Sequence, residues 1–256
     1  MKLTFYPPEW EPDGRDARQE PRAPGEDESE YLFSCRRNLC GCEYLYKLGI
    51  SETLAEDYLI GFDGLFPFGC PYKAAKGCTG GKRWDSLIIP SMSAKGVYSF
   101  TAVNTRNGET RKIGTSFPFG VSSLYWQEPA FVTLSEIDAL TVMSNGAAAL
   151  ALGELGNVGF LLAYMRKHGA ELPRRPLILA LGDDNEAKRE KAARMAGQLR
   201  QMGIPYLLAD KEIYRGRVSL TAARSENARD FSAAVKHALA EAAKLNDKEP
   251  DKGKEA

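Results

Sequence analysis

Acidic residues follow two apolar segments of the chain, and carboxylates gathered at such places can bind a metal ion. Glu136 and Asp138 follow the segment AFVTL, and Asp183 and Asp184 follow the segment PLILAL. Carboxylates repel one another unless a cation neutralises them, and their hard oxygen atoms favour magnesium. The alternative is that the second pair only caps the helix that follows it, because negative charge is favourable at a helix N-terminus.

Apolar and helical segments alternate throughout the second half of the chain. Short apolar runs begin near residues 130, 147, 176 and 204, and each is followed by residues suited to a helix. Such alternation predicts right-handed crossovers and a parallel sheet that is covered by helices on both faces. Ligands of these sheets bind at the carboxyl ends of the strands. Both acidic pairs should therefore meet at one edge of the sheet.

The first half of the chain has a different pattern. Three strand-like segments separated by glycine-containing turns lie between residues 84 and 114, which predicts an antiparallel β-rich part. Helices are expected over residues 42–49 and from Ser51, whose hydroxyl can cap the second helix. The glycine-rich segment 62–85 is expected to be an exposed loop with basic residues.

Both ends of the sequence have the composition of disordered segments. Prolines, glycines and charges dominate residues 7–30, and charges dominate the last residues, so neither can bury enough apolar surface. No apolar run of membrane-spanning length and no secretory signal are present, which predicts a cytoplasmic protein. The expected parts are a disordered leader (1–30), an α+β subdomain (31–127), a parallel-sheet domain (128–245) and a disordered tail (246–256).

Net charge and cysteine content limit the classes of function. Lys plus Arg and Asp plus Glu both total 34, so binding to nucleic acid would require a local basic patch. The five cysteines are an odd number and show no C-x2-C spacing, so we expect neither a disulfide framework nor a zinc site. They are Cys35, Cys40, Cys42, Cys70 and Cys78.

Two segments resemble the motifs of a known family. The residues EIDAL at 136–140, after the strand-like AFVTL, resemble the TOPRIM motif of phage and plasmid DNA primases, in which Glu-Gly is followed by Glu-x-Asp-Ala-Leu-Ser. The segment LILALGDDNEAKRE is similar to the family's second motif, a strand followed by Asp-x-Asp-Glu-Ala-Gly-Arg, and Asp230 after Arg229 resembles its later Lys-Asp motif. Upstream, residues 44–62 and 86–104 resemble the helical beginning and the basic β-rich half of the primase core.

This resemblance covers about residues 40–245 and implies a TOPRIM-type α/β fold, preceded by a smaller α+β subdomain like that of the primase core. In that family the first glutamate acts in acid–base catalysis and metal binding, and the two aspartates of the second motif hold magnesium around the incoming nucleotide and the primer end. The resemblance thus implies Mg²⁺ or Mn²⁺ as the cofactor of an active protein. The candidate ligands are Asp138, Asp183, Asp184 and Asp230.

Several positions depart from these motifs. Leu134 occupies the place of the first glutamate and cannot transfer a proton, a loss that typically lowers a rate by about a hundred- to ten-thousand-fold. In the second motif either Asn185 replaces the second aspartate or, with the alignment moved by one residue, Gly182 replaces the first. Lys188 stands where the family has glycine. Glu136, two residues beyond the missing glutamate, is the candidate substitute for it.

Basic residues of the β-rich part are the candidates for a phosphate-binding groove, although scattered surface cations more often explain such a pattern. The expected partners are single-stranded DNA or a primer-template and nucleotides. A separate replicative helicase is a further expected partner, because the sequence has no Walker-type phosphate-binding loop. The candidate nucleic-acid contacts are Lys82, Arg83, Arg106, Arg111 and Lys112.

Three functions agree with the sequence. The first is a primase-like TOPRIM protein that acts on single-stranded DNA or a primer-template in the replication of a phage, plasmid or other mobile element, with nucleotidyltransferase activity left open by the replaced motif residues. The second is a catalytically inactive TOPRIM module that binds nucleic acid or serves as a scaffold. The third is a TOPRIM nuclease. Primer synthesis measured beside DNA binding distinguishes the first two.

Overall fold

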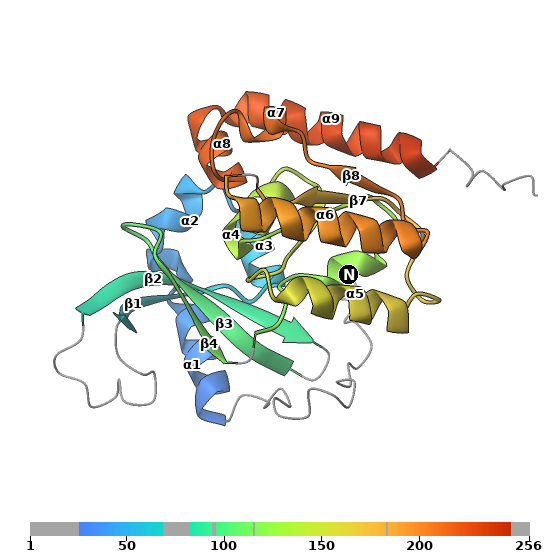
Figure 1. Cartoon of the computed structure of the whole chain (residues 1–256). Coiled ribbons are helices and arrows are strands. Elements are labelled where there is room, and N and C mark those ends of the chain that lie inside the picture. Colours follow the sequence, from blue (N-terminus) through green and yellow to red (C-terminus); the bar gives the residue numbers. More distant parts are fainter. Residues whose placement is uncertain (1–25, 69–81, 94–95, 115, 183, 247–256) are drawn as a thin grey trace, which may run out of the picture. The chain divides into compact units, whose positions relative to one another are not determined.

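The computed structural model describes residues 26–68, 82–93, 96–114, 116–182 and 184–246. The chain forms two compact units, one up to Phe119 and one from Gly120 (Figure 1). The first contains an antiparallel sheet and the second a parallel sheet, each with four strands. This confirms the mixed α/β fold class expected from the sequence. In the ranges given above, every helix is too short or too polar to cross a membrane.

The sheet of the first unit has the strand order β1-β2-β3-β4. Its strands β2 (Lys82–Ser93), β3 (Gly96–Asn104) and β4 (Thr110–Gly114) are the three antiparallel strands that the sequence predicts.

The expectation of an exposed loop from residue 62 was wrong for its first part, because β1 (Gly61–Phe68) pairs with β2. Burial of Phe66 explains the strand, since its side chain packs with Ile88 and Phe100 in an apolar cluster. A β-bulge between Asp63 and Phe66 accommodates the glycine in this strand. Residues 69–81 of the expected loop lie outside the described residues.

Helix α1 extends into the segment that was expected to be a disordered leader, because it begins at Glu26. Tertiary packing explains the difference. Leu32 and Cys35 join the apolar cluster of the sheet, and β1 approaches so closely that a Cβ atom on Gly61 would lie 2.6 Å from Cys35 Cβ. The helices of this unit are α1 (Glu26–Arg37), η1 (Leu39–Gly41), α2 (Glu43–Lys47) and α3 (Glu52–Asp57).

The two short helices expected near residues 42 and 51 are present as α2 and α3. Ser51 caps α3 as predicted, because its Oγ accepts a hydrogen bond from the Leu54 N–H at 3.1 Å.

The parallel sheet of the second unit has the strand order β6-β5-β7-β8 and confirms the alternation seen in the sequence. Every residue of β5, β6 and β7 is buried, as expected for strands covered on both faces. The short strand β8 forms one edge. The strands are β5 (Ala130–Thr133), β6 (Ala148–Ala151), β7 (Leu177–Ala180) and β8 (Tyr206–Leu208).

Helices cover both faces of this parallel sheet. Helices α5 and α6 pack against each other, whereas α4 and α9 both pack against α8. Figure 1 shows α9 on one side of β7 and β8 and α6 on the other. The helices are η3 (Val121–Tyr125), α4 (Glu136–Met143), α5 (Asn157–Lys167), α6 (Glu186–Gln201), α7 (Lys211–Tyr214), α8 (Leu220–Glu226) and α9 (Ala228–Asn246).

The boundary between the units lies between Phe119 and Gly120, eight residues before the boundary at residue 127 that the sequence indicated. Hydrogen bonds within the second unit explain its position. Ser123 Oγ donates to the Ala149 carbonyl at 2.6 Å, and the buried guanidinium of Arg175 donates to the carbonyls of Ser123, Trp126 and Glu128. Residues 120–128 are thus attached to the parallel-sheet unit.

Candidate functional site

The carboxyl edge of the parallel sheet, defined here as residues 134–138 after β5 and residues 181, 182 and 184–188 after β7, brings the described parts of the two sequence motifs together. Strands β5 and β7 are adjacent and parallel, and their last residues, Thr133 and Ala180, are partners in the register. The segments that follow them therefore leave the sheet side by side. The structure confirms that both motifs lie at one edge.

Two motif residues after β5 begin helix α4. Ser135 is the N-cap, and its Oγ accepts a hydrogen bond from the Asp138 N–H at 3.3 Å. Glu136, the candidate substitute for the missing glutamate, is only 6 % exposed. Leu134, at the place of that glutamate, has no oxygen atom in its side chain. The side chain of Glu136 is therefore poorly accessible to a substrate at this edge.

The carboxylate of Asp138 is hydrogen-bonded to Thr221 of helix α8. Its Oδ1 accepts hydrogen bonds from the Thr221 N–H at 2.8 Å and from Thr221 Oγ1 at 2.7 Å. Thr221 Oγ1 also lies 3.0 Å from Thr141 Oγ1, one turn after Asp138 on α4. Burial raises the pKa of Asp138, although the bonds from Thr221 and the positive charge of Lys188 partly offset this increase. The residue thus joins α4 to α8.

An internal ion pair holds the motif after β7. Lys188 Nζ lies 2.6 Å from Asp184 Oδ1, and this bond lowers the pKa of Asp184. Asn185 caps α6, since its Oδ1 accepts from the Lys188 N–H at 3.0 Å. The N–H of Gly182 donates to the hydroxyl of Tyr214 at 3.0 Å. Asp183 lies outside the described residues.

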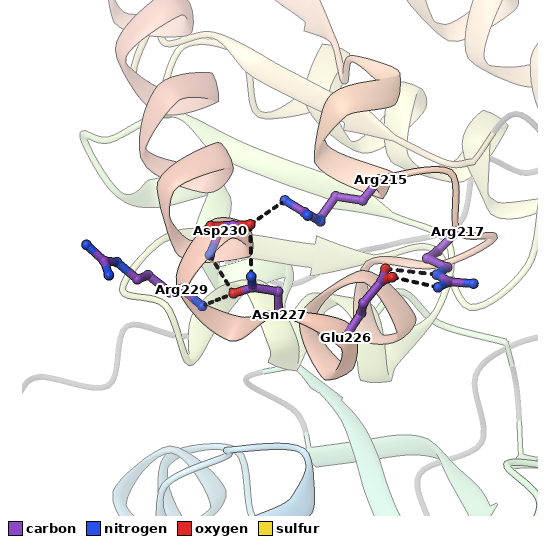
Figure 2. A network of polar contacts seen from close by, with 6 residues as sticks. All are labelled: Arg215, Arg217, Glu226, Asn227, Arg229 and Asp230. Atoms are coloured by element: carbon purple, nitrogen blue, oxygen red, sulfur yellow. Dashed lines mark hydrogen bonds and ion pairs between the residues drawn. The ribbon is translucent and has the colours of Figure 1, made fainter.

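Asp230 belongs to a separate polar network at the start of α9 (Figure 2). Its Oδ2 lies 3.0 Å from Arg215 Nη1 and accepts a hydrogen bond from Asn227 Nδ2 at 2.9 Å. In return, Asn227 Oδ1 accepts from the backbone N–H groups of Arg229 and Asp230, each at 3.1 Å. The carboxylate of Asp230 therefore neutralises an arginine and helps to cap its own helix.

The described carboxylates of this unit do not fit a magnesium site. Magnesium requires nearly octahedral oxygen ligands, and a cluster of carboxylates normally supplies several of them. Asp138 is bonded to Thr221, Asp184 to Lys188 and Asp230 to Arg215. Throughout the described ranges, no group of three or more His, Cys, Asp or Glu side chains is arranged to hold a metal ion.

Three of the five cysteines can be placed. Cys35 and Cys42 are buried free thiols and Cys40 is an exposed one. Burial raises the pKa of Cys35 to about 11 and also raises that of Cys42. Cys70 and Cys78 lie outside the described residues.

In the first unit, the β-pleat separates the basic residues that the sequence groups into one groove. Arg111 pairs with Ala102, and Lys112 pairs with Thr101, so the two neighbours point to opposite faces of the sheet. Lys112 Nζ donates to the Phe117 carbonyl at 3.3 Å. Arg83 alternates with Trp84 and lies on the face opposite to it. The side chain of Lys82 lies outside the described part of its strand.

One face of this sheet combines cations with aromatic rings. The guanidinium carbon of Arg106 lies 5.5 Å from the ring centre of Trp84, and that of Arg111 lies 6.0 Å from the ring centre of Phe66. Trp84 and Phe66 pack in the same apolar cluster, which places both pairs on one face. Arg106 also lies 3.7 Å from a carboxylate oxygen of Asp85. We call Trp84, Arg106 and Arg111 the cation–aromatic face.

Sequence reasoning missed three residues of these sites. Thr221 and Tyr214 lie on short helices far along the chain, and no local pattern links them to the edge. Lys188 was noted only as a departure from a motif, although its spacing of four residues from Asp184 is a signal for an ion pair on a helix.

Of three comparisons with known proteins, only the comparison with solved structures gives a match. No protein-family model matches the chain, and no match was found among curated proteins. Among solved structures, the chain is similar to the crystal structure of the Aquifex aeolicus primase that contains the zinc-binding and RNA polymerase domains. The TM-score is 0.55 at 13 % identity, over 83 % of this chain and 59 % of that chain. The chain thus spans less than two thirds of the primase structure, and the likeness shows that it has a primase-like fold.

Proposed function

We propose that the chain is a primase-like protein that binds single-stranded DNA or a primer-template but does not itself synthesise primers. The observation that carries this proposal is the fold, which is similar to that of a bacterial primase over 83 % of the chain. Within this proposal, the second unit is of the TOPRIM class, because the EIDAL and GDDNEAKR segments follow adjacent strands β5 and β7. Both motifs thus lie at the edge where such sheets bind ligands.

The cation–aromatic face supports the choice of single-stranded nucleic acid as the ligand. Guanidinium groups attract phosphates and also stack on bases, and aromatic rings near them add a platform for bases that does not depend on sequence. Arg106 beside Trp84 supplies both elements at one place. Arg111, two strands from Trp84 on the same face, adds a second cation beside the buried ring of Phe66. A local patch of this kind can act although the net charge of the chain is zero.

The carboxyl edge supports the absence of primer synthesis. Nucleotide transfer needs carboxylates that hold a metal pair between the attacking and the leaving oxygen atoms. Here the first glutamate is replaced by Leu134, and Asp138 and Asp184 are bonded to Thr221 and Lys188. We therefore assign the chain to a binding role in the replication of a mobile element, beside a separate helicase. The sequence motifs, which resemble those of phage and plasmid primases, support this setting.

Fluorescence anisotropy with a labelled single-stranded oligonucleotide tests the binding role. We expect saturable binding that weakens as salt increases, and a loss of at least about tenfold in affinity for the double variant Arg106→Ala and Arg111→Ala. Arg83→Ala is the matched control, because Arg83 lies on the opposite face of the same sheet. Equal binding by the wild type and the double variant would refute the assignment of this face.

Primer synthesis on single-stranded DNA with labelled ribonucleotides, and with magnesium or manganese, tests the second half of the proposal. The binding role predicts no product above the level of a chain-free reaction. Synthesis that Asp183→Asn abolishes would instead show an active enzyme. DNA binding and synthesis both absent would leave the scaffold function as the better explanation of the fold.

A further inference from the structure

Lys188 occupies an unusual position for a lysine. It lies in the first turns of α6 (Glu186–Gln201), and its side chain is 19 % exposed, while that of its partner Asp184 is 32 % exposed. The pair Lys47 and Glu43 in the first unit has the same spacing of four residues, but there the side chains are 73 % and 90 % exposed and the charged atoms are 3.9 Å apart. Since exposed pairs contribute little, the shorter and less exposed pair calls for a specific explanation.

The ammonium group of Lys188 lies against the backbone at the end of β7. A Cβ atom at position 182 would lie 3.5 Å from Lys188 Nζ and 3.1 Å from Asp184 Oδ1. Gly182 also has a positive φ of 87°, which residues with side chains rarely adopt. Glycine at this position therefore opens the space in which the ammonium and the carboxylate meet.

The same ammonium group also acts on the neighbouring motif. Its positive charge favours the ionised form of Asp138, whose own carboxylate lies at the start of α4 after β5. Lys188 thus forms an ion pair with a carboxylate of the segment after β7, and its charge also favours ionisation of a carboxylate in the segment after the adjacent strand β5. A divalent ion could supply the same kind of charge neutralisation to carboxylates that follow adjacent strands.

A divalent ion at this edge would meet two obstacles. It would need oxygen ligands that Asp138 and Asp184 already give to Thr221 and Lys188. It would also lie close to the positive charge of Lys188 on α6, and like charges repel each other.

We propose that the ammonium group of Lys188 is the resident cation of the carboxyl edge and takes the place of a divalent metal ion there. The charge of Asp184 is then neutralised without magnesium, and the geometry of this ion pair does not depend on the metal concentration. The inference concerns the second unit and stands whether or not the first unit binds DNA.

Two measurements on the full chain test this proposal. Electron paramagnetic resonance during a manganese titration gives the affinity for Mn²⁺, and thermal unfolding gives the melting temperature. The wild type should bind Mn²⁺ weakly, and its melting temperature should be equal in magnesium and in a chelator. Lys188→Ala should melt at a lower temperature and bind Mn²⁺ at least about tenfold more tightly, because the competing charge is gone. The double variant Lys188→Ala and Asp184→Asn should lose this gain.

Two further variants serve as controls. Lys188→Arg keeps the charge and should behave like the wild type, and Lys47→Ala removes the exposed lysine of a pair with the same spacing and should leave metal binding unchanged. Manganese binding by the wild type that equals or exceeds that of Lys188→Ala would overturn the proposal. If Lys188→Ala does not fold, the wild type alone decides: a rise of its melting temperature in magnesium that Asp184→Asn abolishes also overturns it.

Discussion

The carboxylate of Asp138 on α4 accepts two hydrogen bonds from Thr221 on α8, one from the backbone N–H at 2.8 Å and one from the hydroxyl at 2.7 Å. The two residues are 83 positions apart in the sequence. A residue that a motif marks as a metal ligand thus has a structural bond to a helix that the sequence did not predict. Asp138 is therefore expected to matter for stability even where no metal is involved.

Asp138→Ala should destabilise the chain by roughly 1–3 kcal/mol, because it removes the acceptor of two hydrogen bonds from the partly buried Thr221 and leaves its N–H without that acceptor. Asp138→Asn keeps an oxygen that can accept the same two bonds and should cost less than Asp138→Ala. Urea unfolding followed by circular dichroism measures both values. Equal losses for the two variants would contradict the role assigned to the acceptor oxygen.

The buried position of Asp138 also predicts a dependence on pH. Its pKa in the folded chain is raised from the ordinary value of 3.8, so the folded state binds the proton more tightly than the unfolded state does. The stabilisation from this proton is complete below pH 3.8 and is lost as the pH rises through the folded pKa. Asp138→Asn lacks this titration. Its stability relative to the wild type should therefore improve as the pH rises from about 4 to neutrality, and a constant or opposite difference would refute this sign.

Gly182→Ala should be more harmful than a change at another glycine with a similar backbone conformation. Gly182 and Gly146 have φ values of 87° and 84°, but only at Gly182 would a Cβ atom meet neighbours, namely Asp184 and Lys188. We expect Gly146→Ala to cost about 1 kcal/mol from the backbone alone and Gly182→Ala to cost about 1 kcal/mol more. Chemical unfolding of both variants provides the comparison, and equal losses would show that the edge has more room than its geometry indicates.

Cysteine reactivity should follow burial. Cys40 is exposed, whereas Cys35 is buried with a pKa raised to about 11, so alkylation of Cys35 at mildly alkaline pH should be on the order of a hundredfold slower. Cys42, which is also buried with a raised pKa, should be protected as well. Mass spectrometry of peptides after timed exposure to iodoacetamide measures each site, with a denatured sample as the reference. Rapid labelling of Cys35 in the folded chain would contradict its place in the apolar cluster.

Local sequence signals predicted much of the second unit. The apolar runs at β5, β6 and β7 were predicted from short-range patterns. The caps at Ser135 and Asn185 depend on equally local signals but were not predicted. The contact between Asp138 and Thr221 has no such signal, because it arises from the packing of α8 against α4. The hydrogen bonds that Thr221 donates to Asp138 could therefore not be foreseen from the motif.

The first unit shows where local patterns mislead. Glycine and proline made the segment after residue 61 resemble a loop, but burial of Phe66 and pairing with β2 outweigh these local preferences. The opposite directions of Arg111 and Lys112, by contrast, follow from strand alternation alone and were available from the sequence. Basic residues of neighbouring positions on a strand should therefore be assigned to one groove only after strand alternation shows that they lie on the same face.

The ion pair between Lys188 and Asp184 determines which cation lies at the carboxyl edge. A dissolved metal ion occupies a site only in proportion to its concentration and affinity, and a chelator or a competing ligand can remove it. The ammonium group of Lys188, four residues after Asp184 in the same chain, has an effective concentration at this carboxylate that is fixed by the chain itself and does not change with the metal concentration of the solution. Occupancy of this place is thus decided when the chain folds, and it ends only when the chain unfolds.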